Sequence, residues 1–247
     1  EMIQALVFAG GSAFGLAAAD GVVAELARDG RGHETIGGRV PIVPAAILYD
    51  LQVAEANARP GPEHGAAAYR AATADPVEMG SVGAGTGAIV AGWRGRDAVR
   101  KGGVGSAAAR FGAATLGALV VANAVGDVFT LGGESLTGGA PIPASTPTGP
   151  GRPLEQTVLV AVVTDAAFGR HEQMHLAVRA HDALAVCFRP AHTRYDGDAV
   201  FTVSCGDVAA NLDEAGEVAF AVVGTAIERA VRRAAAVPGV PAVELPS

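Results

Sequence analysis

Residues 157–163 read TVLVAVV, and they follow a segment of opposite character, GGESLTGGAPIPASTPTGPGRP, at residues 132–153. The first stretch is rich in β-branched residues and predicts a buried central strand. The second is rich in Gly, Pro, Ser and Thr and has no apolar periodicity, so it cannot bury enough surface to offset its ordering entropy. The sequence therefore predicts a mobile linker over residues 132–155 that ends where a central strand begins.

Around this junction, short apolar strands alternate with amphipathic helices, and no internal repeat is present. This order predicts a mixed α/β fold, with sheets covered by helices, in a single domain over residues 1–247. We expect strands at residues 3–9, 81–90, 116–128 and 200–203, an extended segment at residues 40–51, and helices at residues 12–28, 64–74, 167–186 and 216–235.

The composition excludes several classes of protein. Half of the 247 residues are hydrophobic and 17% are charged, with a net charge of −7. A basic stripe that could neutralise phosphates is missing, so no nucleic-acid partner is expected. None of the apolar runs approaches the roughly 20 residues of a membrane helix. Cys187 and Cys205 form neither a disulfide framework nor a metal-ligand pattern, which favours a reducing, cytoplasmic location.

One motif points to zinc. Residues 171–175 read HEQMH, the H-E-x-x-H pattern in which two histidines one helical turn apart bind Zn²⁺ beside a general base. His181 has the spacing of a third ligand, but six residues correspond to about 240° around a continuous helix. Val178 stands where a helix-breaking Gly would be needed. A solvated helix face is the favoured interpretation, and a zinc metallopeptidase using His171, Glu172 and His175 is the alternative.

The junction itself suggests a second chemistry. A threonine hydroxyl is a weak nucleophile unless a base adjoins it, and a free α-amino group on the same residue can be that base. Thr157 would gain such an amine if the chain were cut after Gln156, and a mobile linker would let the new carboxyl end move away. From composition alone, a threonine that merely begins a strand remains the alternative.

Several blocks resemble, in order, the DmpA/BapA-type aminopeptidase family. The resemblance covers nearly the whole chain except the linker and about the last 40 residues. Its blocks are LVFAGGSAFGLAAADGV at residues 6–22, PIVPAAILYDL at 41–51, VGAGTGA at 82–88, KGGVGS at 101–106, VANAVGD at 121–127, VTDA at 163–166, AHD at 180–182 and HTRYDGD at 192–198.

The resemblance implies a four-layer αββα sandwich of the N-terminal-nucleophile type. It implies self-cleavage between Gln156 and Thr157 into an α chain, residues 1–156, and a β chain, residues 157–247. The product would be an amidohydrolase or aminopeptidase acting on small peptides or amide-containing metabolites through an acyl-Thr157 intermediate. It would need no metal or cofactor and would assemble as a homo-oligomer, a tetramer of processed αβ units.

The family pattern also implies roles for particular side chains. It makes Asn123 an oxyanion-stabilising amide, which is physically apt because one such donor contributes roughly 3 kcal/mol. Asp196 and Asp198 match the acidic pair of the nylon-oligomer hydrolases, where a carboxylate near the α-ammonium would tune its proton transfer. Without the family, Asn123 is a satisfied buried amide and the two aspartates belong to a turn.

The sequence departs from the family in three places. Gln156 precedes the nucleophile where members usually have Asn or Gly, which bears on whether and how fast the chain cuts itself. A small-molecule-binding protein on the same scaffold would result if the cut never occurred. Residue spacing places Gly92 or Trp93 where nylon-type members use a lysine, and Lys101 belongs to a different block. Relatives carry some tens of residues before the first block, so we expect a missing segment or a shortened domain.

Overall fold

The computed structural model describes residues 2–53, 57–148 and 155–244. The chain forms two compact units, residues 1–77 and residues 78–247. The single domain expected over residues 1–247 stays a prediction. Among the described residues, no helix combines the length and the apolar character needed to cross a membrane.

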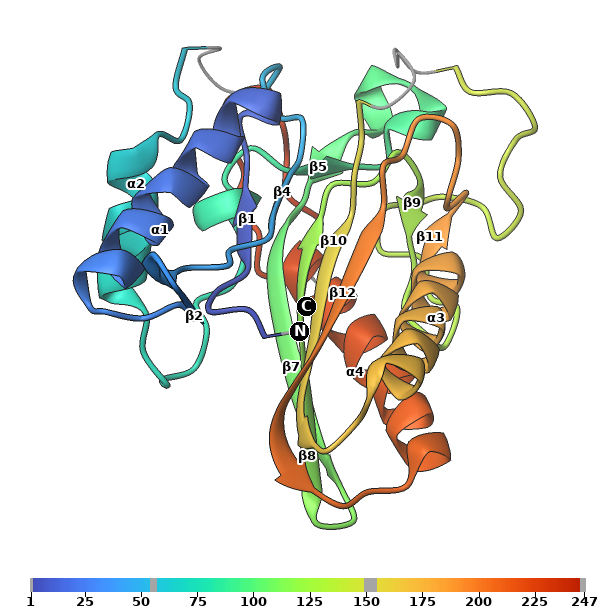
Figure 1. Ribbon diagram of the computed structural model, residues 1–247. Helices are drawn as coiled ribbons and strands as arrows, with labels where there is room; N and C mark the ends of the chain where they lie inside the picture. The colour runs from blue at the N-terminus through green and yellow to red at the C-terminus, as the bar shows by residue number, and fades with distance from the viewer. Residues whose placement is uncertain (1, 54–56, 149–154, 245–247) are drawn as a thin grey trace. The chain divides into compact units, whose positions relative to one another are not determined.

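The first unit pairs two parallel strands, β1 (Val7–Ala9) and β4 (Ala45–Ile47), and packs two helices against each other (Figure 1). The predicted helix at residues 12–28 is present as a 3₁₀ turn, η1 (Ser12–Leu16), followed by α1 (Ala17–Arg28). The helix predicted at residues 64–74 is α2 (Pro62–Ala71), and it begins earlier because proline suits the first helical position. The unit also contains a short hairpin, β2 (His33–Thr35) with β3 (Gly38–Val40).

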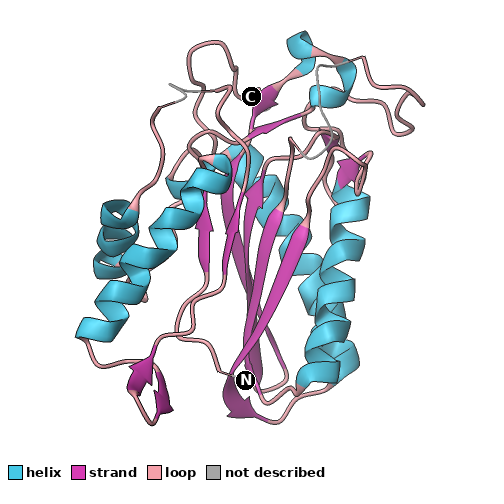
Figure 2. Ribbon diagram, turned by 45° about the horizontal axis from the view of Figure 1, so that its top comes forward, coloured by secondary structure: helices cyan, strands magenta, loops and turns pink. Residues whose placement is uncertain are grey.

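The second unit is built on a four-stranded sheet in the order β12-β10-β8-β7. The predicted central strand is β10 (Leu159–Ala166), which runs antiparallel to β8 (Ala114–Ala122) and parallel to β12 (Ala199–Val208). Figure 2 shows these long strands side by side, with two long helices along one face. The strand that begins two residues after the candidate nucleophile Thr157 therefore has a hydrogen-bonded neighbour on each side.

The edge strand β7 (Gly103–Phe111) was not predicted, because its sequence GVGSAAARF has only one β-branched residue. Its small residues let α4 (Leu212–Arg232) approach the sheet closely. A Cβ atom at Gly105 would collide with the carbonyl oxygen of Ala226 in α4. The contact between helix and sheet, rather than intrinsic strand propensity, explains why this segment is extended.

The two long helices of this unit match the predictions and cover one face of the sheet. α3 (Arg170–Cys187) is continuous, and α4 begins at Leu212, four residues before the predicted start. The Asn211 side chain accepts a hydrogen bond from the Glu214 N–H at 3.0 Å, which caps α4. The buried side chains of both helices join those of β8 and β10 in the main hydrophobic core.

The glycine-rich segment at residues 81–90 differs from its prediction as a strand. Only Ile89 and Val90 are extended, and a 3₁₀ turn precedes them, because the glycines favour tight turns over a ladder. The short elements of this unit are η2 (Gly83–Gly85), β5 (Ile89–Val90), η3 (Gly92–Arg94), η4 (Arg96–Ala98), β6 (Arg100–Lys101), β9 (Asp127–Val128) and β11 (Phe188–Arg189).

The first part of the predicted linker is attached to the second unit. Thr137 is buried, and its hydroxyl donates to the Asp127 carboxylate at 2.7 Å. Arg94 makes two hydrogen bonds to the same carboxylate and a third to the Thr137 carbonyl. The Trp93 indole N–H donates to the Ala144 carbonyl at 2.8 Å. Composition alone did not predict these attachments, because the partners lie outside the segment; residues 149–154 lie outside the described residues.

Candidate active site

Thr157 lies just before β10 and is only 9% exposed. Leu159 lies opposite Val121 in the antiparallel pairing of β10 with β8, and the same register brings Thr157 opposite Asn123. The Thr157 N–H donates to the Asn123 carbonyl oxygen at 2.8 Å. Sheet pairing thus brings together two predicted site residues that lie 34 positions apart in the sequence.

The carbonyl oxygen of Gln156 accepts two hydrogen bonds. The Thr157 hydroxyl donates to it at 2.6 Å, and the Gly197 N–H donates to it at 2.8 Å. Gln156 is held in place as well by its own N–H, which donates to the Tyr195 carbonyl at 2.9 Å. A Cβ atom at Gly197 would lie 3.0 Å from the Thr157 Oγ, so glycine lets this backbone approach the hydroxyl.

The Gln156 side chain is in an unfavourable setting. It is buried, and its Oε1 atom has no hydrogen-bond partner among the described residues. Leaving a buried acceptor unsatisfied costs about 1–3 kcal/mol. The side-chain oxygen of the residue before the candidate nucleophile is therefore buried without a hydrogen bond from the described residues.

Asn123 is fully buried, and the Ile89 N–H donates to its side-chain oxygen at 3.0 Å. This bond fixes the orientation of the amide, because the oxygen faces Ile89 and the NH₂ end faces away from it. The other side of the same peptide unit, the Ala88 carbonyl, accepts a hydrogen bond from Lys101 Nζ at 2.8 Å. One peptide unit therefore connects a buried lysine with the buried amide.

Lys101 is the lysine that residue spacing does not align with the lysine of the nylon-type family members. It is fully buried, and its ammonium group donates to three backbone carbonyls, those of Gly85, Ala88 and Gly102. β7 and β8 form an antiparallel hairpin in which Gly103 lies opposite Ala122, so Lys101 and Asn123 lie near the same end of it. Lys101 and Asn123 stay close whatever the length of the hairpin between them, whereas the number of residues that separates them along the sequence changes with that length.

The two aspartates accept hydrogen bonds from two backbone segments of the site, Asp198 from the residue after Thr157 and Asp196 from the segment that follows Asn123. Asp196 accepts from the Val125 N–H at 3.1 Å with one oxygen, and from the Thr193 hydroxyl at 2.7 Å with the other. Asp198 accepts from the Val158 N–H at 2.8 Å. The pKa of Asp196 is raised, first by burial and next by the nearby charge of Asp198. The structure thus gathers Thr157, Asn123, Asp196 and Asp198 at one end of the sheet.

Two histidines, which the sequence analysis had not assigned to this site, lie beside Asp198. His192 Nδ1 is 2.8 Å from the second carboxylate oxygen of Asp198. The rings of His181 and His192 pack edge to face, with their centroids 5.0 Å apart. Sequence spacing could not reveal this cluster, because His181 belongs to α3 and His192 to the loop before β12.

The similarity of this chain to known proteins identifies its family. The family model described as peptidase family S58 matches residues 1–243. The chain belongs to peptidase family S58. The family resemblance inferred from the ordered sequence blocks is therefore confirmed.

Two named relatives agree with this assignment. An uncharacterized aminopeptidase of Mycobacterium leprae is 40% identical over 231 residues, which are 85% of this chain and 62% of that protein. A 6-aminohexanoate-oligomer endohydrolase of Paenarthrobacter ureafaciens is 26% identical over 225 residues, 83% of this chain and 61% of that enzyme. The chain thus spans less than two thirds of the length of these relatives.

A solved structure confirms the fold. The L-aminopeptidase D-Ala-esterase/amidase of Ochrobactrum anthropi, described as a new variant of the Ntn hydrolase fold, matches with a TM-score of 0.70 at 23% identity. The match covers 94% of this chain and 68% of that one. The predicted α/β fold of the N-terminal-nucleophile type is therefore that of this S58 chain.

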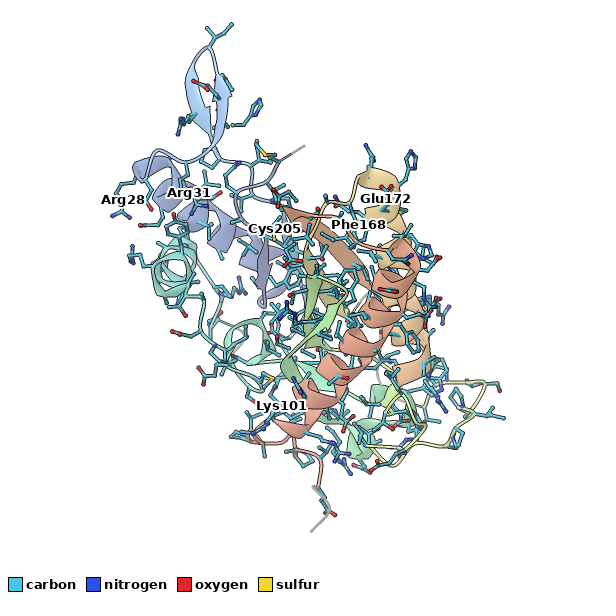
Figure 3. All side chains as sticks on the ribbon, turned by 90° about the horizontal axis from the view of Figure 1, so that it is seen from below. Arg28, Arg31, Lys101, Phe168, Glu172 and Cys205 are labelled. Carbon is cyan, nitrogen blue, oxygen red and sulfur yellow. The ribbon has the colours of Figure 1, made fainter. Side chains whose placement is uncertain are left out.

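The zinc-like motif lies elsewhere in the S58 chain. Thr157 precedes β10, whereas His171 and Glu172 begin α3 after the far end of that strand, roughly 26 Å away at about 3.3 Å per residue. Figure 3 accordingly shows Glu172 and Lys101 at opposite ends of the second unit. Among the residues that the structure describes, no three His, Cys, Asp or Glu side chains form a group that could hold a metal ion.

The His181 environment leads to a pH prediction. Burial lowers its pKa, and His192 lowers it further, against the opposing effects of Asp198 and Asp182. Below about pH 6.5 the unfolded chain then binds more protons at this residue than the folded chain does. Neutral His181 therefore stabilises the folded chain. The stabilisation is fully present above pH 6.5, the pKa of an unfolded histidine, and is lost as the pH falls through the lowered pKa of the folded state.

We expect a His181→Gln variant to lose this part of the pH dependence. Urea unfolding at pH 7.5 and pH 5.5 measures it, with Thr157→Ala present in both proteins so that every sample is one chain. The stability difference between the two pH values should be smaller in the variant. An equal or larger difference would mean that His181 is not the group responsible.

Proposed function

We propose that this S58 protein is an N-terminal-nucleophile amide hydrolase that activates itself by cutting between Gln156 and Thr157. One observation carries the proposal. The carbonyl oxygen of Gln156 accepts hydrogen bonds from the hydroxyl of Thr157, at 2.6 Å, and from the N–H of Gly197, at 2.8 Å. The peptide bond to be cut thus has a hydroxyl beside its carbonyl and a fixed amide donor on its oxygen.

In the activating reaction, Thr157 Oγ attacks the carbonyl carbon of Gln156. The hydroxyl proton passes to the leaving nitrogen, the C–N bond breaks, and an ester joins Gln156 to Thr157 Oγ. Water then hydrolyses this ester, which yields a carboxylate on Gln156 and a free α-amino group on Thr157. The Gly197 N–H would stabilise the negative charge that develops on the Gln156 oxygen during the attack.

In the processed enzyme the α-amine of Thr157 acts as the base for its own hydroxyl. Its nitrogen already lies 2.8 Å from the Asn123 carbonyl oxygen, which would keep the amine beside the hydroxyl. The Asn123 NH₂ group would donate to the oxyanion formed from the substrate, because the oxygen of the same amide faces Ile89. Asp196 and Asp198 would supply negative charge next to the α-ammonium.

The names of the relatives support a substrate class. One relative is named an aminopeptidase and another a 6-aminohexanoate-oligomer endohydrolase, and both names describe amide hydrolysis. We therefore propose small peptides or amide-containing metabolites as substrates, cleaved through an acyl-Thr157 intermediate. The family resemblance further supports a homo-oligomer of processed αβ units, which light scattering on the purified protein measures.

A denaturing gel and an intact-mass measurement test the proposal, alongside an assay with 6-aminohexanoate oligomers and aminoacyl 4-nitroanilides. We expect two fragments, of which the smaller begins TVLVAV, and amide hydrolysis that survives treatment with a chelator. An intact chain whose hydrolysis is abolished by the chelator would instead support the zinc alternative. An intact chain without hydrolytic activity would support the other alternative, a small-molecule-binding protein on the same scaffold.

A further inference from the structure

Asp198 forms a bridge between the start of β10 and a histidine. One of its carboxylate oxygens accepts from the Val158 N–H at 2.8 Å, and the other lies 2.8 Å from His192 Nδ1. The Asp198 side chain is 5% exposed, whereas that of His192 is 38% exposed. Among the residues that the structure describes, this nearly buried carboxylate has two hydrogen-bond partners, and the one supplied by a side chain is His192.

We propose that His192 is a positioning residue for the Thr157 reaction: its Nδ1–H holds the Asp198 carboxylate that fixes the backbone next to Thr157. The proposal rests on the function proposed above and adds a residue to it. A carboxylate only accepts hydrogen bonds, so His192 must donate from Nδ1. His192 acts through Asp198 and Val158, which is why it is not itself a catalytic residue.

The backbone next to the nucleophile is held by this arrangement from both sides. Asp198 binds the N–H of Val158, and the N–H of Ala199, the next residue, donates to the Val158 carbonyl at 3.0 Å. Gly197, the residue before Asp198, donates to the Gln156 carbonyl. Three consecutive residues, 197–199, therefore fix the chain from Gln156 to Val158. Rotation of the Asp198 side chain would release the middle one of these contacts.

The conformation of His192 itself points to a specific role. It has φ +52°, in the left-handed region that most residues other than glycine avoid. Such a conformation is strained and persists where other contacts outweigh the strain. Here the contact that outweighs the strain is the hydrogen bond to Asp198, and the ring of His181 also packs against the imidazole. The left-handed backbone of His192 sets the direction in which its imidazole points.

The test compares two substitutions that both tolerate this backbone conformation. Glycine and asparagine adopt positive φ more readily than other residues, but only asparagine keeps a side-chain N–H near the place of Nδ1. We therefore compare His192→Gly with His192→Asn, and include His181→Gln, which removes the ring contact but leaves the Asp198 hydrogen bond. The rate of self-cleavage is followed from time zero on gels after cell-free translation, so no substrate is needed.

We expect the His192→Gly variant to cut itself roughly 10–100-fold more slowly, the effect of losing a hydrogen bond to a charged group. The His192→Asn variant should recover to within several-fold of the unsubstituted chain, and His181→Gln should cut at the unsubstituted rate. Thermal unfolding of all variants on the Thr157→Ala background checks that they fold alike.

Three results would overturn the assignment. Unchanged cutting in His192→Gly would show that the Asp198 contact is dispensable. Equal slowing in His192→Gly and His192→Asn would show that the donor is not what matters, and slowing in His181→Gln would assign the effect to ring packing. In each case an efficient cut in the unsubstituted chain keeps the proposed function intact. If the unsubstituted chain never cuts itself, the proposed function fails and this assignment fails with it.

Discussion

A Thr157→Ala variant is expected to remain a single uncut chain, with self-cleavage slowed at least about 10⁴-fold, the scale of losing a catalytic nucleophile. Alanine removes the Oγ that lies 2.6 Å from the Gln156 oxygen, while the Gly197 N–H remains in place. The measurement is the fraction of intact chain on denaturing gels over time, confirmed by mass. Thr157→Ser, which keeps a hydroxyl at the same position, should still be cut.

The chain offers a matched control for this experiment. Thr164 lies in β10, the strand that Thr157 precedes; it is buried and donates its hydroxyl to the Thr115 carbonyl at 2.7 Å. Thr164→Ala therefore removes the same atoms and a similar hydrogen bond, at a cost to stability of about 1 kcal/mol. It should be cut like the unsubstituted chain. A cut between residues 156 and 157 in Thr157→Ala itself would exclude Thr157 as the nucleophile.

Asn123 variants are expected to lose hydrolysis by about 10²–10³-fold in kcat, the effect of removing one oxyanion donor. Asn123→Ala and Asn123→Asp separate two roles of the side chain, which are accepting the hydrogen bond from the Ile89 N–H and donating to the oxyanion. Ionised aspartate still accepts the hydrogen bond from the Ile89 N–H, but a carboxylate cannot donate to an oxyanion. Both variants should lose activity, and Asn123→Ala should also leave a buried N–H unpaired. Hydrolysis of 6-aminohexanoate oligomers and urea unfolding measure the two effects separately.

The lysine behind Asn123 explains why this amide would be an effective donor. Lys101 Nζ binds the carbonyl side of the Ala88–Ile89 peptide unit, and the N–H side binds Asn123. Hydrogen bonds in series polarise one another, so the positive charge strengthens the next donor along the line. An Asn123→Asp variant that hydrolyses as fast as the unsubstituted enzyme would contradict this role for the amide.

The long elements of the second unit could be predicted from the sequence because their patterns are strong. The β-branched run at residues 157–163 gives β10, and the helices at residues 167–186 and 216–235 appear as α3 and α4 within a few residues. β7 was missed because glycine and alanine have low strand propensity. Its conformation depends on α4, which lies about 100 residues later, and no local pattern contains that contact.

The candidate site was predicted only in part. Thr157, Asn123, Asp196 and Asp198 came from the family resemblance, and the register of β8 with β10 now explains why the first two meet. Lys101 was set aside because residue counts ignore how a hairpin closes. His192 was missed because its partner is defined by a turn and a left-handed backbone, neither of which has a distinctive sequence signal.

The sheet order has a consequence for the proposed cut. After cleavage, β7 and β8 would belong to one fragment, and β10, β12, α3 and α4 to the other. The fragment boundary would then run through the middle of the sheet, with β8 paired to β10 across it and α4 packed on β7. Neither fragment would keep a complete core, so the two should dissociate only when both unfold. The mature protein would behave as one body in native buffer and as two chains in denaturant.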